Sequence, residues 1–286
     1  MNRTSFRRLP WLMVAPALLL FLGLLIAPLL MTVGLSFNEF DLQLGPQAGT
    51  FTLEHYKALV SDSFFLEIFW RTCWISAVVT LLCICIGAPQ AYILSRMGSP
   101  WRSIVLLIVL APLLISVVVR AFGWSVLLGQ DGLLNHLLQA VGLDRVRILY
   151  TETAVIIALV HVMLPFMVIP VWTSLQKLDP TVESAALTLN ASPLTTLRRI
   201  ILPQALPGIL SGSLIVFGLS ASSFAIPGLL GGRRVKMVAT LIYDEYLHEL
   251  NWPLGAAIAI GLLLANLVIM LTWNRALERR FKKALG

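Results

Sequence analysis

The stretch that decides the fold is Asp179–Gly208, DPTVESAALTLNASPLTTLRRIILPQALPG, a polar segment between two long apolar runs. Asp179 followed by Pro180 is typical of a helix start, with a side-chain cap and a proline in the first turn. The apolar residues that follow recur at a spacing near 3.6, which predicts a short helix. Asn190 is expected to end it, because asparagine tolerates a left-handed backbone.

The second half of this segment repeats the same signals. Ser192 followed by Pro193 predicts another helix start, and the helix that begins there carries Arg198 and Arg199. We expect Leu202–Pro203 to stop it, because proline cannot continue the hydrogen-bond pattern of a helix. The sequence therefore predicts two short helices, set at an angle, that project from a membrane on one side.

The composition indicates a membrane protein. Of the 286 residues, 58% are hydrophobic and only 12% are charged, with a mean hydropathy of +0.87, whereas soluble proteins carry about 25% charged residues. We predict an all-α polytopic membrane protein that forms a single domain over residues 1–286. Its six transmembrane helices, each with roughly the 20 residues that cross a bilayer, are expected at about 11–36, 72–94, 103–128, 153–175, 209–230 and 254–273.

The basic residues predict the orientation, because cytoplasmic loops carry an excess of lysine and arginine. The predicted spans place thirteen of them on the side of both termini and seven on the other side. Both termini and the loop 179–208 are therefore expected to be cytoplasmic. Arg120 falls late in the third span, close to the far interface. The thirteen basic residues expected on the cytoplasmic side are Arg3, Arg7, Arg8, Arg96, Arg102, Lys177, Arg198, Arg199, Arg275, Arg279, Arg280, Lys282 and Lys283.

The loop resembles that of the integral-membrane permeases of binding-protein-dependent ABC importers. These permeases carry the pattern EAA, three residues, G, nine residues, I-x-LP. The resemblance implies that the first loop helix couples the membrane spans to a cytoplasmic ATPase subunit. The matching coupling residues are Glu183, Ser184, Ala185, Ala186, Leu189, Asn190, Ile200, Leu202 and Pro203.

Two positions depart from the family pattern. Ser184 stands where the pattern has glutamate, and the carboxylate of Glu183 is displaced by one residue, about 100° around the helix. Asn190 stands in place of glycine, a mild change at a position that needs only a positive φ. A surface connector with no partner is the alternative interpretation of the loop.

Four further stretches resemble the spermidine/putrescine branch of these permeases: VRAFGWSVLLGQDGLLN at 119–135, LPFMVIPVWTSLQKLDP at 164–180, PGLLGG at 227–232 and NWPLGAA at 251–257. The resemblance implies import of polyamines across the bacterial inner (cytoplasmic) membrane. It also implies a second, different permease subunit, two ATPase subunits and an extracytoplasmic substrate-binding protein as partners. Import of 4-aminobutyrate or an opine-like amino acid by the same architecture is the alternative.

Motifs for catalysis are absent from the sequence. It has no G-x-x-x-x-G-K-[ST], no H-E-x-x-H and no G-x-S-x-G, so we expect a non-catalytic subunit. We expect no cofactor or metal in this chain, with ATP and magnesium bound by the partner subunits. The scattered basic residues give no reason to expect nucleic acid, and membrane lipid surrounds the spans. An ion-coupled carrier is the alternative from another class, disfavoured because no carboxylate falls within a predicted span.

Candidates for the substrate path, or for contact with the binding protein, lie near the outer side: Arg120, Trp124, Tyr243, Asp244, Glu245 and Glu249. The acidic members lie in the amphipathic segment Met237–Leu250, where a solvated helix face is the plainer interpretation. Arg120 would repel a polyamine in the path, so we expect it to snorkel or to pair with a loop carboxylate. His161, the only histidine within a span, is expected to bond to a neighbouring helix.

Overall fold

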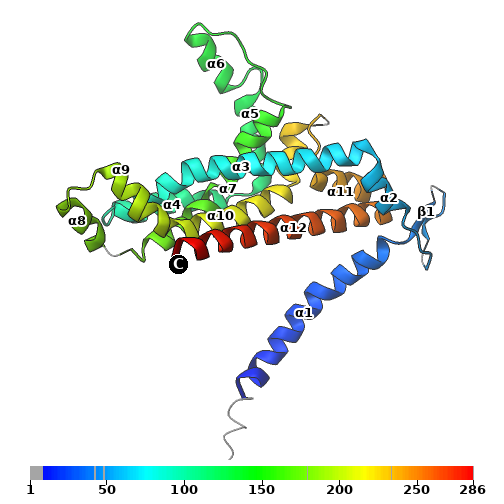
Figure 1. Ribbon diagram of the computed structural model, residues 1–286. Helices are drawn as coiled ribbons and strands as arrows, with labels where there is room; N and C mark the ends of the chain where they lie inside the picture. The colour runs from blue at the N-terminus through cyan, green and yellow to red at the C-terminus, as the bar shows by residue number, and fades with distance from the viewer. Residues whose placement is uncertain (1–8, 42, 48, 179, 233, 286) are drawn as a thin grey trace, which may run out of the picture. The chain divides into compact units, whose positions relative to one another are not determined.

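The computed structural model describes residues 9–41, 43–47, 49–178, 180–232 and 234–285. This part of the chain is predominantly helical, which confirms the all-α prediction (Figure 1). A short hairpin of β1 and β2 supplies its strands. In chain order the elements are α1 (Leu9–Leu35), β1 (Glu39–Asp41), β2 (Gly45–Gln47), α2 (Glu54–Ser61), α3 (Ser63–Arg96), α4 (Trp101–Leu114), α5 (Val117–Leu128), α6 (Leu133–Ala140), α7 (Glu152–Leu175), α8 (Pro180–Thr188), α9 (Pro193–Thr196), the π-helical turn η1 (Leu197–Ile201), α10 (Leu202–Ala221), the π-helical turn η2 (Pro227–Gly231), α11 (Val238–Leu247) and α12 (Trp252–Leu285).

Six helices of the described chain are long and apolar enough to cross a membrane, as the sequence predicts. Three of them differ in extent from the predicted spans, and one of the six pairs α5 with α6. The six candidate spans are Val14–Leu35, Ser63–Arg96, Val117–Ala140, Glu152–Leu175, Pro193–Ala221 and Trp252–Trp273.

The helix of the second span begins earlier than predicted. We expected it near residue 72, but α3 begins at Ser63, where Asp62 Oδ1 accepts a hydrogen bond from the Phe64 amide at 2.9 Å. An acceptor in this position is the usual cap of a helix start. The apolar run thus marks only the membrane-embedded part of a longer helix. For the same reason α12 continues to Leu285, well past the predicted end at 273.

The predicted third span, 103–128, is wrong as a continuous helix. α4 ends at Leu114 and α5 begins at Val117, with Ile115 and Ser116 in extended conformation between them. Pro112 cannot donate a backbone hydrogen bond, and serine and β-branched residues are weak helix formers. These residues together favour the break, which leaves α4 as a shorter apolar helix.

The fifth span was also placed wrongly. We expected a stop at Leu202–Pro203 and a span over 209–230, but the helix runs without interruption from Pro193 to Ala221. The π-helical turn Leu197–Ile201 precedes Pro203, and the Leu202 amide bonds to the Leu197 carbonyl. A π-helical turn shifts each backbone hydrogen bond by one residue, from i−4 to i−5. The shift occurs just before Pro203, whose nitrogen has no hydrogen to donate. The helix ends at Ala221, where the Ser222 amide and the Ser222 hydroxyl both donate to the Gly218 carbonyl, at 3.1 and 2.9 Å.

The core is built on α7, the most buried of the six spans, with α10 packed along it (Figure 1). Two glycines of α10 permit this close approach. A Cβ added to Gly208 would lie 2.5 Å from the Pro170 carbonyl oxygen and 2.7 Å from Val171 Cα. At Gly212 it would lie 2.9 Å from the sulfur of Met167. Small residues are the usual means by which membrane helices pack closely without a hydrophobic driving force between them.

The contacts divide the chain into two compact units. One comprises Met1–Phe65 and Ile242–Ala265, and the other Leu66–Leu241 and Asn266–Gly286. In the described part of the first unit, the segment after α1 is held by a hydrogen bond between the hydroxyls of Ser36 and Tyr56 at 2.6 Å. The Phe37 ring stacks on Phe51 with centroids 5.1 Å apart. The second unit holds α7, α10 and the loop between them.

Candidate functional site

The loop between α7 and α10 contains the first predicted helix, α8, at Pro180–Thr188. The expected cap, Asp179, lies outside the described residues. The structure does not describe the side chains of Glu183 and Ser184. What the one-residue displacement of the Glu183 carboxylate does to the contact with an ATPase subunit therefore stays a prediction. α8 and α9 project from one end of the α7–α10 pair (Figure 1).

The two alanines of the pattern do not face the same way. Ala186 is 7% exposed and packs inside the chain, whereas Ala185 is exposed. Successive helix positions differ by about 100°, which accounts for the difference. Leu189, just after α8, is 82% exposed. Val182 of α8 is exposed as well. The exposed apolar side chains of α8 and its end therefore include those of Val182, Ala185 and Leu189, whereas Ala186 is turned inward.

The turn after α8 confirms the predicted role of Asn190. Its φ is +56°, the left-handed conformation that the pattern assigns to glycine. The Ala191 amide then donates to the Ala186 carbonyl at 3.0 Å, which closes the end of the helix. The next helix has the predicted cap, because the Thr195 amide donates to Ser192 Oγ at 3.3 Å. Both helices are therefore fixed by bonds between residues close in sequence.

The second half of the loop is the start of a membrane span. Leu202 and Pro203 lie within the continuous helix, and Ile200 is half-buried. Arg198 and Arg199 are exposed on the π-helical turn. Ser174 Oγ at the end of α7 donates to the Gln204 carbonyl at 2.8 Å. This bond ties the two spans together where the loop leaves them.

The acidic candidates lie on or just after α11, as the amphipathic segment predicts. Asp244 Oδ1 lies 3.5 Å from His248 Nδ1, and the Tyr243 ring contacts that histidine with centroids 5.8 Å apart. Glu245 is half-buried and Glu249 is exposed. Asp244 is thus engaged within its own helix end, which leaves Glu249 as the carboxylate that is most open to a cation or another protein.

Trp124 and His161 meet within the membrane-spanning region, and Arg120 lies about one helical turn from Trp124 on α5. Trp124 Nε1 donates to His161 Nδ1 at 3.3 Å, and the two rings meet edge to face with centroids 5.6 Å apart. The predicted bond from His161 to a neighbouring helix is therefore confirmed. Pairing of Arg120 with a loop carboxylate is not found: its Nε and Nη1 atoms are covered, with no hydrogen-bond partner in the described chain.

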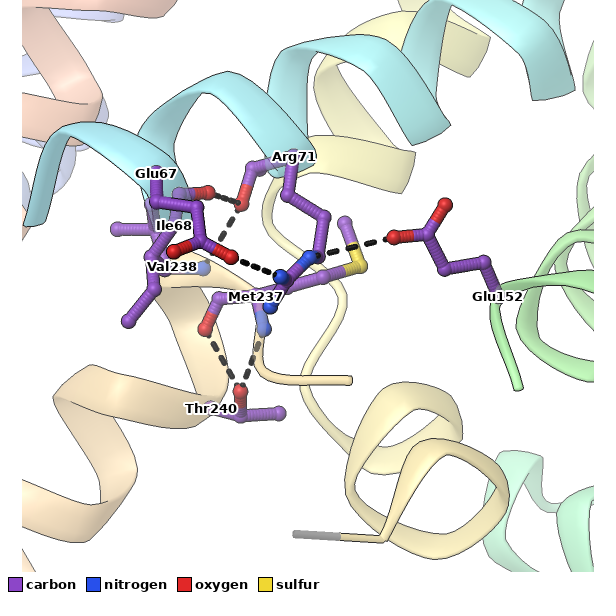
Figure 2. A network of polar contacts seen from close by, with 8 residues as sticks. Glu67, Ile68, Arg71, Glu152, Met237, Val238 and Thr240 are labelled. Carbon is purple, nitrogen blue, oxygen red and sulfur yellow. Dashed lines mark hydrogen bonds and ion pairs between the residues drawn. The ribbon is translucent and has the colours of Figure 1, made fainter. Parts of the chain in front are cut away.

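A polar network that the sequence did not predict fixes the other end of the helix pair (Figure 2). Arg71 of α3 pairs with Glu67 and, through Nε at 3.2 Å, with Glu152 at the start of α7. Thr72 Oγ1 accepts from the Val238 amide at 2.9 Å, which holds the start of α11 against α3. The sequence shows that Arg71 and Glu152 are opposite charges at the ends of apolar runs. It does not show that these two residues, 81 positions apart, pair with each other.

A cavity of about 470 Å³ lies among α3, α10 and α12. Its described lining carries no charged side chain. The Thr80 and Ser213 hydroxyls on its wall donate to Ser76 and Ile209 carbonyls of their own helices. Trp74 and Trp273 add aromatic surface. The cavity therefore presents a largely apolar and aromatic wall. Among the described residues, no group of three His, Cys, Asp or Glu side chains is placed to hold a metal.

Comparison with known families gives a match over residues 83–283 to the model described as "Binding-protein-dependent transport system inner membrane component". The chain belongs to this family. It is therefore a permease subunit of an ABC importer and a multi-pass protein of the bacterial inner membrane. The predicted family is confirmed, and the loop 179–208 lies well inside the matched region.

The permease has curated relatives named "Spermidine/putrescine transport system permease protein PotB". The relative from Haemophilus influenzae is 35% identical over 227 residues, 79% of each chain. That from Salmonella typhimurium is 32% identical over 96% of this chain and 94% of its own. That from Escherichia coli is 34% identical over 90% and 93%. A "Molybdenum transport system permease protein ModB" from Mycobacterium bovis is 35% identical over 68% of this chain and 74% of its own.

Solved structures share the permease fold. A chain of a bacterial ABC transporter involved in the import of the acidic polysaccharide alginate has a TM-score of 0.81 and 22% identity, covering 97% of this chain and 99% of that chain. The MetNI methionine ABC transporter follows with a TM-score of 0.60 and 19% identity, over 77% and 99%. At these identities the likeness concerns the fold and not the substrate.

Proposed function

We propose that this permease forms half of the translocation path of an importer for polyamines of the spermidine/putrescine type. The observation that carries the proposal is its similarity to three polyamine permeases at 32–35% identity. In two of them the matched region spans nine-tenths or more of both chains. The similarity thus includes the membrane spans that meet the substrate as well as the loop.

The proposed assembly holds a second, different permease subunit, two ATPase subunits and an extracytoplasmic substrate-binding protein. ATP and magnesium are bound by the ATPase subunits, and this chain binds no cofactor and catalyses no reaction. Both termini and the loop 179–208 face the cytoplasm, where positive charge gathers. The whole chain acts as one membrane domain.

The loop is proposed to be the coupling element. α8 docks on an ATPase subunit through the exposed side chains of Ala185 and Leu189, while Ala186 holds the helix to its own chain. The Asn190 turn and the Ser192 cap keep α8 in a fixed geometry. The bond from Ser174 to Gln204 then passes the displacement of the loop to the paired spans α7 and α10.

One observation favours the alternative substrate, 4-aminobutyrate or an opine-like amino acid. The Arg120 guanidinium has covered nitrogens without an acceptor in the described chain, and a substrate carboxylate would pair with it. A polyamine would instead be repelled by an unpaired Arg120 in the path. The two substrates therefore require different surroundings for this one residue.

The test is ATP hydrolysis by the complete complex in liposomes with its binding protein. Spermidine, putrescine and 4-aminobutyrate are added separately at equal concentration. We expect the polyamines to stimulate hydrolysis and 4-aminobutyrate to leave it at the basal rate. Stimulation by 4-aminobutyrate alone would contradict the proposed substrate and leave the importer assignment in place.

A further inference from the structure

An exposed polar side chain marks one face of the most buried span. His161 lies near the middle of α7, yet its side chain is exposed within this chain, among neighbours that are mostly buried. Ionisable side chains at the middle of a membrane helix face other protein or a water-filled path and not lipid. The face that carries His161 therefore lies against other protein or a water-filled path in the assembled transporter.

Hydrogen bonding fixes what His161 offers on this face. The Trp124 indole is a donor only, so its 3.3 Å bond to Nδ1 makes that nitrogen the acceptor. A histidine with Nδ1 as acceptor carries its proton on Nε2. The ring thus presents an N–H donor at Nε2.

Arg120 adds further donors beside it. Arg120 and Trp124 are four residues apart on α5 and share one helix face, so Arg120 lies on the side of α5 where Trp124 bonds His161. Covered Arg120 Nε and Nη1 atoms have no acceptor among the described residues. Leaving charged donors unpaired away from water is costly. The cluster therefore offers donors and a positive charge without any acceptor.

We propose that Arg120 and His161 form a carboxylate site within the membrane, filled by an acidic side chain of the second permease subunit. The inference rests on the proposed function, which supplies that subunit. A carboxylate fits because it pairs with a guanidinium through charge-assisted hydrogen bonds. A resident side chain fits better than a substrate, because a substrate leaves in every cycle and would expose the unpaired charge again. Once paired, Arg120 no longer repels a polyamine.

The first test captures the carboxylate directly. In the complete complex, Arg120→Lys places a primary amine at this position, and a zero-length carbodiimide joins an amine to a carboxylate in contact with it. We expect a covalent product of the two permease subunits in the Arg120→Lys complex, at least tenfold above the wild-type background, with one acidic residue of the second subunit at the junction. The matched control Arg145→Lys, at an exposed pair with Asp131, should give no product between subunits.

The second test reverses the charges. Arg120→Glu should lower the second subunit recovered with this chain at least tenfold, and exchange of the captured acid for arginine should restore it to within twofold. Absence of both the junction and the rescue overturns the proposal. It is also overturned if Arg120→Leu assembles normally and loses only uptake of 4-aminobutyrate, since the carboxylate then comes from the substrate. A wild-type complex without a second permease would instead refute the proposed function.

Discussion

The two ends of the α7–α10 helix pair are built in different ways. At the end that carries α8 and α9, the bonds within the loop join residues no more than five positions apart, as in the Asn190 turn and the Ser192 cap. One bond between distant residues, from Ser174 to Gln204, links the two helices there. At the other end the bonds join distant segments. Arg71 pairs with Glu152 and Thr72 accepts from Val238 (Figure 2). The Tyr150 amide donates to the Leu230 carbonyl at 2.9 Å.

The two ends also differ in what they expose. The loop end presents large apolar side chains, with Leu189, Leu194 and Leu197 all exposed. At the network end Met237 and Val238 are fully buried, while Trp70 and Tyr150 are exposed and the buried Ser220 hydroxyl has no hydrogen-bond partner in the described chain. We infer that the loop end is completed by another protein.

The largest expected effect comes from the packing that joins the two ends. Gly208→Leu would force side-chain atoms into the backbone of Pro170 and Val171, and we expect it to destabilise the chain by about 3 kcal/mol, at the upper end for overpacking. The midpoint of thermal unfolding of the purified complex measures this. Gly23→Leu in α1 is the control, because nothing lies within 4 Å of a Cβ there. Equal midpoints for the two variants would contradict the packing.

A smaller effect is expected at the network end. Thr72→Val keeps the shape of the side chain but removes the acceptor of the buried Val238 amide, at a cost of about 1–3 kcal/mol for an unsatisfied donor. Thr80→Val is the matched control, because its hydroxyl bonds only to a carbonyl of its own helix. We expect a lower unfolding midpoint for the first variant alone. If both variants unfold together, the bond to Val238 does not stabilise this end.

The ion pair should contribute less. Arg71→Met removes the link to Glu67 and Glu152, and we expect a loss of about 1 kcal/mol, the upper range for partly exposed pairs. Arg145→Met breaks a more exposed pair with Asp131 and should be nearly neutral. Because salt screens such pairs, the difference between the two variants should shrink at high ionic strength. A difference that persists there would point to packing of the Arg71 side chain instead.

The smallest effect concerns the loop end. Asn190→Ala places a Cβ that disfavours φ = +56°, at a cost of about 1 kcal/mol, whereas Asn190→Gly fits without strain. Hydrogen exchange of the Ala191 amide reports this local turn directly. We expect exchange to be about fivefold faster in the alanine variant, the factor that 1 kcal/mol gives, and nearly unchanged in the glycine variant. Equal rates in both variants would show that the turn does not depend on residue 190.

The same difference explains what the sequence could predict. The α8 turn, the Ser192 cap and the family pattern are local, so residues such as Asn190 and Pro193 predict them correctly. The break at Ile115–Ser116 and the continuous helix through Pro203 were not predicted from the sequence. Hydropathy indicates which residues lie in lipid, but it does not indicate where the backbone hydrogen bonds of a helix are interrupted or continue. The Arg71–Glu152 pair and the inward turn of Ala186 depend on tertiary packing. Neither could be predicted from spacing alone.

The most direct test of the account is substrate-stimulated ATP hydrolysis by the reconstituted complex that carries Leu189→Asp. The loop account predicts that stimulation falls at least tenfold while the unfolding midpoint of the isolated chain stays unchanged, because Leu189 contacts another protein. Leu44→Asp, at an equally exposed leucine between β1 and β2, should leave stimulation intact. Full stimulation in the Leu189→Asp complex would contradict the claim that this end of the helix pair couples the permease to its ATPase.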